Sequence, residues 1–412
     1  MTEVSRRSFL KTTAAASLAS MPIRIDPVTR HPPPRLATPS QEDPLGVRGE
    51  FPVTEEQTYL NTASTGPLSR IAHEALTGYA EKRLRRRGGA LSEAEASART
   101  RFARLFGADE DEIGFLYATS DGENIVTRAM EWRAGDNVVV DELHFTTTFV
   151  LYRELEKRHG IELRVVPAHG GRPPIDEYAA RTDDRTRLLS VAWVSNRNGY
   201  RHDLPPLAEL AHAHGAYLYA DAIQALGAFA TNLHDEGVDF ACGNGYKWMF
   251  ADFGCAPFYV RREHLSWLEP DRYGHGQVAE TLPGNRFRLR TNAEKYEHAN
   301  VAYGPAAALD AALSLLDRVG LDRIEAHTVS LAAQLRAGVA GLGIEPFTPP
   351  DNASPIVSFY HGLDSQTLAR ELETKDIAVT FQEEGRLVRS AVAMFNTRGD
   401  IDRLLGVLAA LV

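Results

Sequence analysis

Short apolar runs alternate with amphipathic stretches along most of the chain. The apolar runs predict strands, and the amphipathic stretches, with apolar residues at helical spacing, predict helices between them. This alternation predicts an α/β fold whose mostly parallel sheet has helices on both faces, making three layers. The expected strands cover residues 112–117, 137–140, 163–166, 187–194 and 216–220, and the clearest helices cover 125–131, 149–159 and 204–214.

The pattern changes after Pro305. An Ala- and Leu-rich helical region runs to about residue 343, and a shorter α+β pattern follows, with apolar runs at 356–360 and 377–381 and a final helix from Ile401. We therefore expect a smaller C-terminal α+β domain over 306–412. The larger domain would span 45–305, and residues 1–44 would form a leader with a Pro-rich linker.

The N-terminal segment Ser5–Lys11 (SRRSFLK) resembles the twin-arginine export signal of bacteria. Signals of this kind are addresses that a receptor reads, and they are normally removed. We expect the twin-arginine machinery to deliver the protein to the periplasm or beyond. An ordinary basic N-terminus is the alternative, and the cleavage site and retention at the membrane stay open.

Composition narrows the classes of partner. The net charge of -10 and the isoelectric point near 5.8 argue against nucleic acid as the main partner. The two cysteines, Cys242 and Cys255, form no disulfide framework and are expected to pack as small apolar residues. His212 and His214 lack a third ligand nearby in the sequence, so we expect no metal site.

Asp221 and Lys247 are the two charged residues most costly to place. Asp221 ends an apolar run, and Lys247 lies between Tyr246 and Trp248 in a mostly apolar window. Charged groups avoid such surroundings unless a partner or a chemical task compensates. Lysine is rare here beside arginine, which suggests an amine that must lose its proton. The alternatives are a lysine whose head reaches water and an aspartate that caps a turn.

This pair is what enzymes dependent on pyridoxal 5'-phosphate (PLP) need. A lysine forms the Schiff base with the cofactor, and a carboxylate keeps the pyridine nitrogen protonated. The segment DAIQALGA…VDFACGNGYKWM resembles the class V aminotransferases, which are fold-type I PLP enzymes. These include cysteine desulfurases, kynureninase-like lyases and isopenicillin N epimerase. The resemblance extends from Tyr59 (YLNTASTGPLS) to Thr397 (RSAVAMFNT), and it implies a homodimer that acts on an amino-acid-like substrate.

The resemblance also assigns roles to individual residues. Lys247 would carry PLP and act as acid and base, and Asp221 would face the ring nitrogen. Thr119 and Ser120, at a helix N-terminus, would hold the phosphate, although an ordinary helix cap would look the same. The phosphate site would be completed by Asn244, by Tyr246 and by Asn300, which stands where relatives use a threonine of the neighbouring subunit.

The remaining assignments concern the ring and the substrate. Phe145 would stack on the pyridine ring, with His144 as a second candidate. The ring's 3'-oxygen would be hydrogen-bonded by Asn196 and Gln224. Arg389 would bind the substrate α-carboxylate, since a guanidinium suits bidentate binding, and Asn61 and Ser64 would join it. A surface arginine is the alternative interpretation of Arg389.

The segment 381–388 (FQEEGRLV) sets an expectation about the reaction. Cysteine desulfurases carry a nucleophilic cysteine on a loop shortly before the substrate-binding arginine, and this segment has none. Desulfurase activity is therefore not expected, and transamination is the main expectation. Epimerisation like that of isopenicillin N epimerase and C–S or C–N lyase activity are alternatives, because all begin with loss of the Cα proton. A cofactor-free binding protein on the same fold is an alternative of another class.

Overall fold

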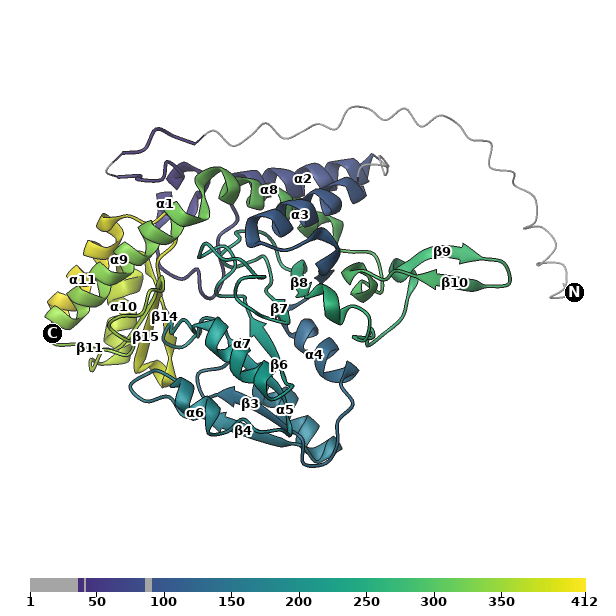
Figure 1. Cartoon of the computed structure of the whole chain (residues 1–412). Coiled ribbons are helices and arrows are strands. Elements are labelled where there is room, and N and C mark those ends of the chain that lie inside the picture. The colour runs from purple at the N-terminus through teal and green to yellow at the C-terminus, as the bar shows by residue number, and fades with distance from the viewer. Residues whose placement is uncertain (1–35, 41, 86–90) are drawn as a thin grey trace, which may run out of the picture. The chain divides into compact units, whose positions relative to one another are not determined.

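The computed structural model describes residues 36–40, 42–85 and 91–412, which Figure 1 shows as a coloured ribbon. These residues belong to one compact unit, His31–Val412. The expected export signal at Ser5–Lys11 and most of the expected linker lie outside the described residues. Within the part of the chain that is described, no helix combines the length and the apolar character needed to cross a membrane.

A sheet of seven strands forms the centre of the larger part, in the order β2-β8-β7-β6-β5-β3-β4. Only β8 runs antiparallel to its neighbours, and every other pair is parallel. The expected mostly parallel α/β sheet is therefore confirmed. The strands are β2 (Ile113–Leu116), β3 (Asn137–Asp141), β4 (Glu162–Val166), β5 (Thr186–Ala192), β6 (Tyr217–Asp221), β7 (Phe240–Cys242) and β8 (Ala256–Val260).

Helices cover both faces of this sheet because its buried strands carry apolar residues on both sides. Val138, Val140 and Tyr219 pack in one cluster with helices α4 (Thr119–Ala129) and α5 (Thr146–His159). The residues that alternate with them, such as Val139 and Leu218, pack in a second cluster. That cluster contains α2 (Arg70–Leu84), α3 (Leu91–Phe106), α7 (Leu204–Ala213) and α8 (Tyr303–Val319).

The expected helical region after residue 305 consists of two helices. Helix α8 ends at Val319, and α9 (Leu321–Gly341) begins after Gly320, whose φ of 90° suits glycine. Helix α4 starts at Thr119, as expected from the resemblance, six residues before the amphipathic stretch that begins at residue 125. Its first turn is polar, and the side chain of Asp121 accepts a 2.9 Å hydrogen bond from the backbone N–H of Ala118. A search for apolar periodicity misses such a turn.

The smaller part is built on the antiparallel sheet β11-β12-β15-β14. Its own cluster of buried residues includes Leu335 of α9, Leu368 of α10 and Leu404 of α11. A smaller C-terminal α+β part is thus present. Its elements are β11 (Glu345–Pro346), β12 (Ile356–Tyr360), α10 (Ser365–Thr374), β13 (Ile377–Ala378), β14 (Thr380–Gln382), β15 (Leu387–Ala391) and α11 (Arg398–Leu411).

A single boundary at 305/306 does not separate the two parts, because segments on each side of it pack against the other part. That boundary falls inside α8, which packs against α2 and α3. At the other end, β1 (Thr58–Tyr59) pairs in parallel with β13 of the smaller part. Both arrangements depend on contacts between segments far apart in sequence. Strand β1 thereby holds the residues that follow it next to the site described below.

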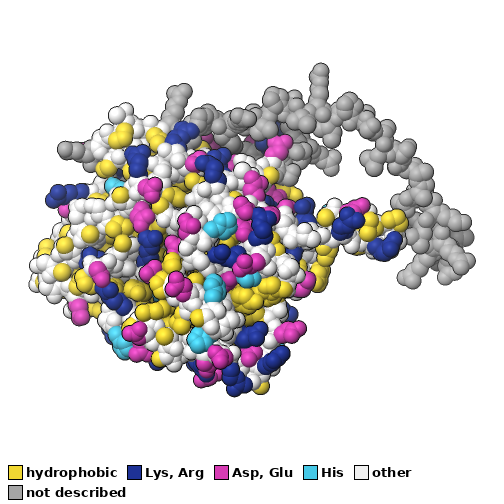
Figure 2. All heavy atoms as spheres, viewed as in Figure 1, with side chains coloured by type: hydrophobic (Ala, Val, Ile, Leu, Met, Phe, Trp, Pro, Cys, Tyr) yellow, Lys and Arg dark blue, Asp and Glu magenta, His cyan; other side chains and the backbone are white. Residues whose placement is uncertain are grey.

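A two-stranded hairpin, β9 (Val278–Leu282) and β10 (Arg286–Leu289), extends away from the large sheet (Figure 1). Phe287 in β10 is 54% exposed. In the view of Figure 2, acidic and basic side chains are interspersed over the surface. Shorter helical elements are η2 (Arg48–Glu50), α1 (Val53–Glu56), η4 (Glu110–Glu112), α6 (Ile175–Ala179), η5 (Arg262–His264), η6 (His275–Gln277), η7 (Ala293–Tyr296) and η8 (Glu383–Gly385).

Candidate active site

A cavity of about 170 Å³ lies beyond the carboxyl ends of β5 and β6, beside the N-terminus of α4. This is the usual position of ligands in open α/β sheets. Most of the residues expected to hold the cofactor line this single cavity. They are Thr119, Ser120, Phe145, Asn196, Asp221, Gln224, Asn244, Tyr246 and Lys247.

Lys247 lies in the loop that follows β7 and is only 9% exposed. Burial lowers the pKa of its ammonium to about 8. The negative charge of Asp221 raises this pKa, and the positive charge of Arg389 lowers it. All three groups therefore lie within electrostatic reach of one another. An amine with a pKa near 8 can both accept and donate a proton close to neutral pH.

Asp221 is the last residue of β6, and its side chain is on the cavity side of the sheet. Its Oδ1 accepts a 3.1 Å hydrogen bond from the backbone N–H of Ile223. Burial raises the pKa of this carboxyl, whereas the Ile223 hydrogen bond and the charge of Lys247 lower it. A cation placed next to Asp221 would therefore favour the carboxylate.

The N-terminus of α4 forms one end of the cavity. Thr119 Oγ1 accepts a 3.0 Å hydrogen bond from the backbone N–H of Asn244. The side-chain amide of Asn244 donates a 2.8 Å bond to the carbonyl of Tyr117, and its buried Oδ1 has no partner among the described residues. The first N–H groups of a helix have no partner within it and attract anions. This end of the cavity therefore suits a phosphate.

The structure distinguishes between the two candidates for stacking on the ring. Phe145 lines the cavity and is 47% exposed. His144 is buried behind it, and its Nδ1 accepts a 2.7 Å hydrogen bond from the backbone N–H of Phe145. Burial lowers the pKa of His144 to about 4, so its ring is neutral. Phe145 is thus the residue whose flat face is available to a ligand.

Asn196 and Gln224 differ in how much of their hydrogen-bonding capacity is free. The buried Oδ1 of Asn196 has no partner among the described residues. The amide of Gln224 donates to the carbonyl of Ala63 at 2.9 Å and accepts from Trp248 Nε1 at 2.7 Å. Gln224 therefore also anchors the segment next to Lys247.

Arg389, in the middle of β15, is a buried cation. Its Nη1 donates a 2.7 Å hydrogen bond to the carbonyl of Asn196, and its Nη2 contacts Ser64 Oγ at 2.5 Å and Thr380 Oγ1 at 3.1 Å. Burial lowers the pKa of this guanidinium to about 10. Among the described residues no acid pairs with it, and its buried Nε has no partner. An anionic ligand would supply what this cation lacks.

The N-terminal segment supplies the other two residues expected at the substrate. Ser64 Oγ lies 2.8 Å from Thr380 Oγ1, and Asn61 Oδ1 accepts a hydrogen bond from the same threonine hydroxyl. Asn61 is also bridged to Ala391, so β15 holds this segment beside Arg389. Asn300, in contrast, lies outside the cavity of Lys247. It lines a second cavity of about 150 Å³ with Tyr117, Asp121 and other residues.

Three residues of the site are absent from the sequence-based expectations. Glu123 and Thr148 line the cavity, and Thr380 holds Arg389. Glu123 follows Thr119 and Ser120 at helical spacing, which places all three on one face of α4. That spacing in the sequence indicates that Glu123 faces the same site as Thr119 and Ser120. Nothing local in the sequence indicated Thr148 or Thr380, because both reach the site through packing between distant segments.

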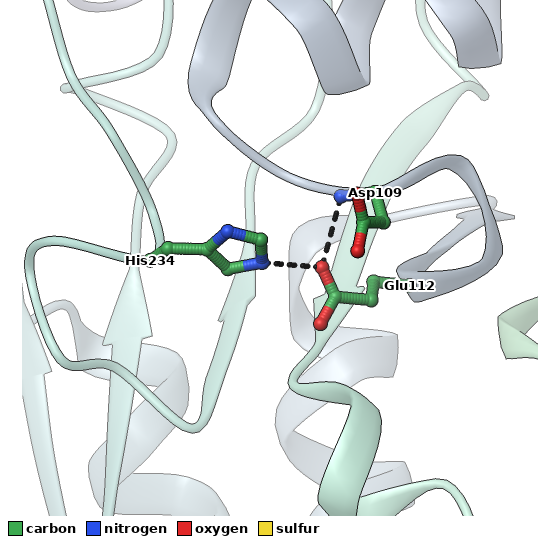
Figure 3. A group of neighbouring side chains, drawn as sticks. All are labelled: Asp109, Glu112 and His234. Carbon is green, nitrogen blue, oxygen red and sulfur yellow. Dashed lines mark hydrogen bonds and ion pairs between the residues drawn. The ribbon is translucent and has the colours of Figure 1, made fainter.

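Two clusters of histidine and acidic side chains have their ligand atoms within 4.8 Å of one another: Asp109, Glu112 and His234; and Asp239, Glu263 and His264. In the first, Glu112 Oε2 binds His234 Nε2 at 2.6 Å and the backbone N–H of Asp109 at 2.9 Å (Figure 3). Glu112 Oε1 accepts from the backbone N–H of Arg262. In the second, Asp239 Oδ1 binds His264 Nε2 at 2.6 Å. Each cluster is thus held by a hydrogen bond between its histidine and a buried acid.

Comparison with solved structures supports the same fold. The cysteine desulfurase of Thermococcus onnurineus NA1, in its apo form, has a TM-score of 0.81 and 23% identity, covering 90% of this chain and 99% of that one. The cystine C–S lyase C-DES, in complex with its product cysteine persulfide, has a TM-score of 0.81 and 20% identity, covering 88% and 99%. In another structure of C-DES, glycine is covalently linked to the PLP cofactor.

The expectation about the reaction is wrong. A curated relative from Methanothermobacter thermautotrophicus, a probable cysteine desulfurase, is 30% identical over 385 residues, covering 87% of this chain and 96% of the relative. This relative does not support transamination as the main reaction, and it contradicts the exclusion of desulfurase activity. The loop cysteine was a poor guide, because elimination from Cα and Cβ can break a C–S bond without a protein thiol.

The family itself is clear. The family model for aminotransferase class V matches residues 64–404, which include the whole of the cavity and Arg389. PLP is the cofactor of this fold, and the cavity offers an amine, an acid, a flat ring and an anion-binding helix end. The chain belongs to the class V aminotransferase family.

Proposed function

We propose that this protein is a PLP-dependent enzyme that cleaves the C–S bond of cysteine or of a cysteine derivative. The main support is that Lys247, Asp221 and Arg389 meet at one site in a chain that is 30% identical to a probable cysteine desulfurase over nearly its whole length. The alternative of a lyase, considered from the sequence, agrees with this proposal.

The cavity residues would hold PLP in one orientation. The N-terminus of α4, Thr119, Ser120 and Asn244 would bind the phosphate, and Asp221 would pair with the ring nitrogen. Phe145 would cover one face of the ring, and Asn196, whose buried Oδ1 has no partner among the described residues, lines the same cavity. When bound, PLP supplies an electron sink for the electron pair released at the substrate Cα.

Arg389 would orient the substrate. Its guanidinium is fixed by Ser64, Thr380 and the carbonyl of Asn196, and it has no acidic partner among the described residues. The α-carboxylate of an amino acid would supply that partner, and a planar guanidinium can bind it through two hydrogen bonds. With the carboxylate bound there, the substrate's Cα would lie toward Lys247, whose pKa is affected by Arg389.

Lys247 would accept and return protons at Nζ. With a pKa of about 8 in the free protein, a substantial fraction of this amine is neutral at pH 7 to 8 and can accept a proton. Asp221 would remain an anion next to the cationic ring nitrogen. The apolar residues around Lys247, such as Trp248 and Met249, are buried and keep bulk water away.

The sulfur would leave the site on a small molecule. Cys242 and Cys255 are buried, and burial raises the pKa of both thiols. The segment 381–388 contains no cysteine. A thiol held in its neutral form inside the protein is a poor nucleophile. We therefore expect released sulfide or a small persulfide rather than sulfur bound to this chain.

The test is to incubate the PLP-loaded protein with L-cysteine and, separately, with L-cystine. Sulfide, persulfide, pyruvate and alanine are then measured. We expect sulfur release from at least one of the two substrates, with pyruvate marking elimination and alanine marking transfer of the sulfur to a small thiol, such as a second cysteine molecule, which becomes a persulfide. Lys247→Ala is the control that should abolish both. A fully loaded protein that releases no sulfur but exchanges amino groups between amino and keto acids would refute the proposal.

Export and dimerisation are further parts of the proposal. The segment Ser5–Lys11 supports twin-arginine export, which cell fractionation of the Arg6→Lys, Arg7→Lys variant would test by loss of the periplasmic pool. Exposed aromatic side chains near the cavity, Tyr117 at 75% and Phe253 at 53%, support a homodimer. Light scattering of the purified protein should then give twice the mass of the chain.

A further inference from the structure

Glu123 is a second carboxyl in the cavity of Asp221. It lies on α4, one turn after Thr119 and Ser120, and it lines the same cavity as Asp221 and Lys247. Its side chain is buried, with the residue only 4% exposed. A buried acid needs a reason to be there, and the roles described above for the cofactor and the substrate do not use it.

Neutral hydroxyl groups surround this carboxyl. Its Oε1 accepts hydrogen bonds from Tyr152 Oη at 2.7 Å and from Ser190 Oγ at 2.5 Å, and its Oε2 contacts Thr148 Oγ1 at 3.0 Å. Among the described residues Glu123 forms no ion pair with a lysine, an arginine or a histidine. A buried carboxylate without a cation is expensive, so the neutral acid is favoured.

The side chains that act on Glu123 come from three neighbouring elements, and none of them is a cation. Thr148 and Tyr152 belong to α5, Ser190 to β5, and Tyr219 and Asp221 to β6. Burial raises the pKa of Glu123, and the charge of Asp221 raises it too, against the hydrogen bonds from Ser190, Tyr152 and Thr148. Tyr219 is buried, and burial raises the pKa of its phenol well above the usual value.

The hydrogen-bonded chain continues to His144 without meeting a positive charge. Ser190 Oγ lies 3.4 Å from His144 Nε2, and His144 Nδ1 accepts the backbone N–H of Phe145. The neutral ring must therefore carry its proton on Nε2, where it can donate to Ser190. Ser190 in turn donates to Glu123. This series of hydrogen bonds links the backbone of Phe145 to Glu123 in the cavity.

Asp221 and Glu123 differ in what favours their ionised forms. Asp221 has a backbone hydrogen bond from Ile223 and the charge of Lys247, and it would also face the ring nitrogen. Glu123 has hydrogen bonds from hydroxyl groups only. When two acids occupy one cavity, the first to ionise disfavours the second. The negative charge therefore goes to Asp221 and the proton goes to Glu123.

We propose that Glu123 is a positioning residue of the cofactor cavity: as a neutral carboxylic acid it holds the hydroxyls of Tyr152, Ser190 and Thr148, and it leaves Asp221 as the single anion at the ring nitrogen. This inference depends on PLP as the cofactor. It does not depend on which substrate is cleaved, so it can fail or hold independently of the proposed C–S cleavage.

The experiment compares Glu123→Gln, Glu123→Ala and Tyr152→Phe, which removes one of the three hydroxyls without changing charge, each purified and loaded with PLP. The visible absorption of the bound cofactor is titrated with pH, and the affinity for PLP is measured with the apo proteins. Gln keeps the size and neutrality of the acid. We expect Glu123→Gln and Tyr152→Phe to keep the midpoint of the wild-type titration within about 0.3 pH units, roughly 0.4 kcal/mol.

Glu123→Ala tests the positioning role, because it leaves the three hydroxyls without their common partner. We expect it to bind PLP about tenfold more weakly, the equivalent of about 1.4 kcal/mol, while Glu123→Gln restores most of the affinity. A midpoint that falls by one pH unit or more in Glu123→Gln would show that Glu123 is an anion and would overturn the proposal. Unchanged PLP affinity in Glu123→Ala would overturn the positioning role. If the Ala variant does not fold, the pH titration of Glu123→Gln decides.

Discussion

Gly66 lies directly against the backbone of Lys247. Its N–H donates a 2.8 Å hydrogen bond to the carbonyl of Tyr246, and a Cβ at position 66 would overlap the carbonyl oxygen of Lys247. Lys247 is therefore held by a segment from the N-terminal part of the chain. That contact needs a residue without a side chain.

We predict that Gly66→Ala displaces the loop of Lys247. Overpacking at a buried contact costs about 1–3 kcal/mol of stability, and the shifted lysine should lose affinity for PLP. Urea unfolding and the visible absorption of the bound cofactor measure the two effects. Gly406→Ala is the control, because a Cβ there meets no atom within 4 Å and lies in α11. Equal behaviour of the two variants would contradict this prediction.

The depressed pKa of Lys247 predicts how cofactor uptake depends on pH. Only the neutral amine can attack the aldehyde of PLP, so the rate of uptake by the apo protein should rise with pH through a midpoint of about 8. Because Asp221 raises the pKa of Lys247, Asp221→Asn should move this midpoint to lower pH. Stopped-flow absorbance measures both. A midpoint near 10.5, the usual pKa of a lysine, would show that the amine is not desolvated.

Arg389→Lys tests the carboxylate site. Lysine keeps the charge but loses the planar pair of donors, and hydrogen bonds to charged groups are worth about 1.5–3 kcal/mol. We expect kcat/KM for the amino-acid substrate to fall by roughly 10–100-fold, with an unchanged spectrum of the bound cofactor. Arg386→Lys, on the same hairpin with a side chain 71% exposed, is the matched control and should retain wild-type kinetics.

The two cysteines should be dispensable for breaking the C–S bond. Cys242→Ala and Cys255→Ala, alone and together, should change sulfur release by less than about threefold, which is below 1 kcal/mol, although truncation of buried residues lowers stability. Assays of sulfide and persulfide measure this. If a correctly folded and PLP-loaded double variant released no sulfur, one of these thiols would be the sulfur acceptor.

Several parts of the site could be predicted from sequence because they depend on local chemistry. Asp221 ends an apolar strand, and Lys247 stands alone among aromatic residues; both are confirmed to line one cavity. The strands were located closely for the same reason, since an apolar run of the right length marks a buried strand. The reaction could not be obtained in this way, because transamination and C–S cleavage share the same first proton transfer.

The sequence by itself determined the alternation of strands and helices and singled out Lys247 and Asp221, because periodicity and the cost of burying a charge can be judged from neighbouring residues. Only the tertiary structure decided that Glu123 shares the cavity with Asp221, that Thr380 holds Arg389, and that Gly66 lies against Lys247. These relationships join segments far apart in the chain, and burial, close approach and the balance of charge between them exist only after the chain has packed.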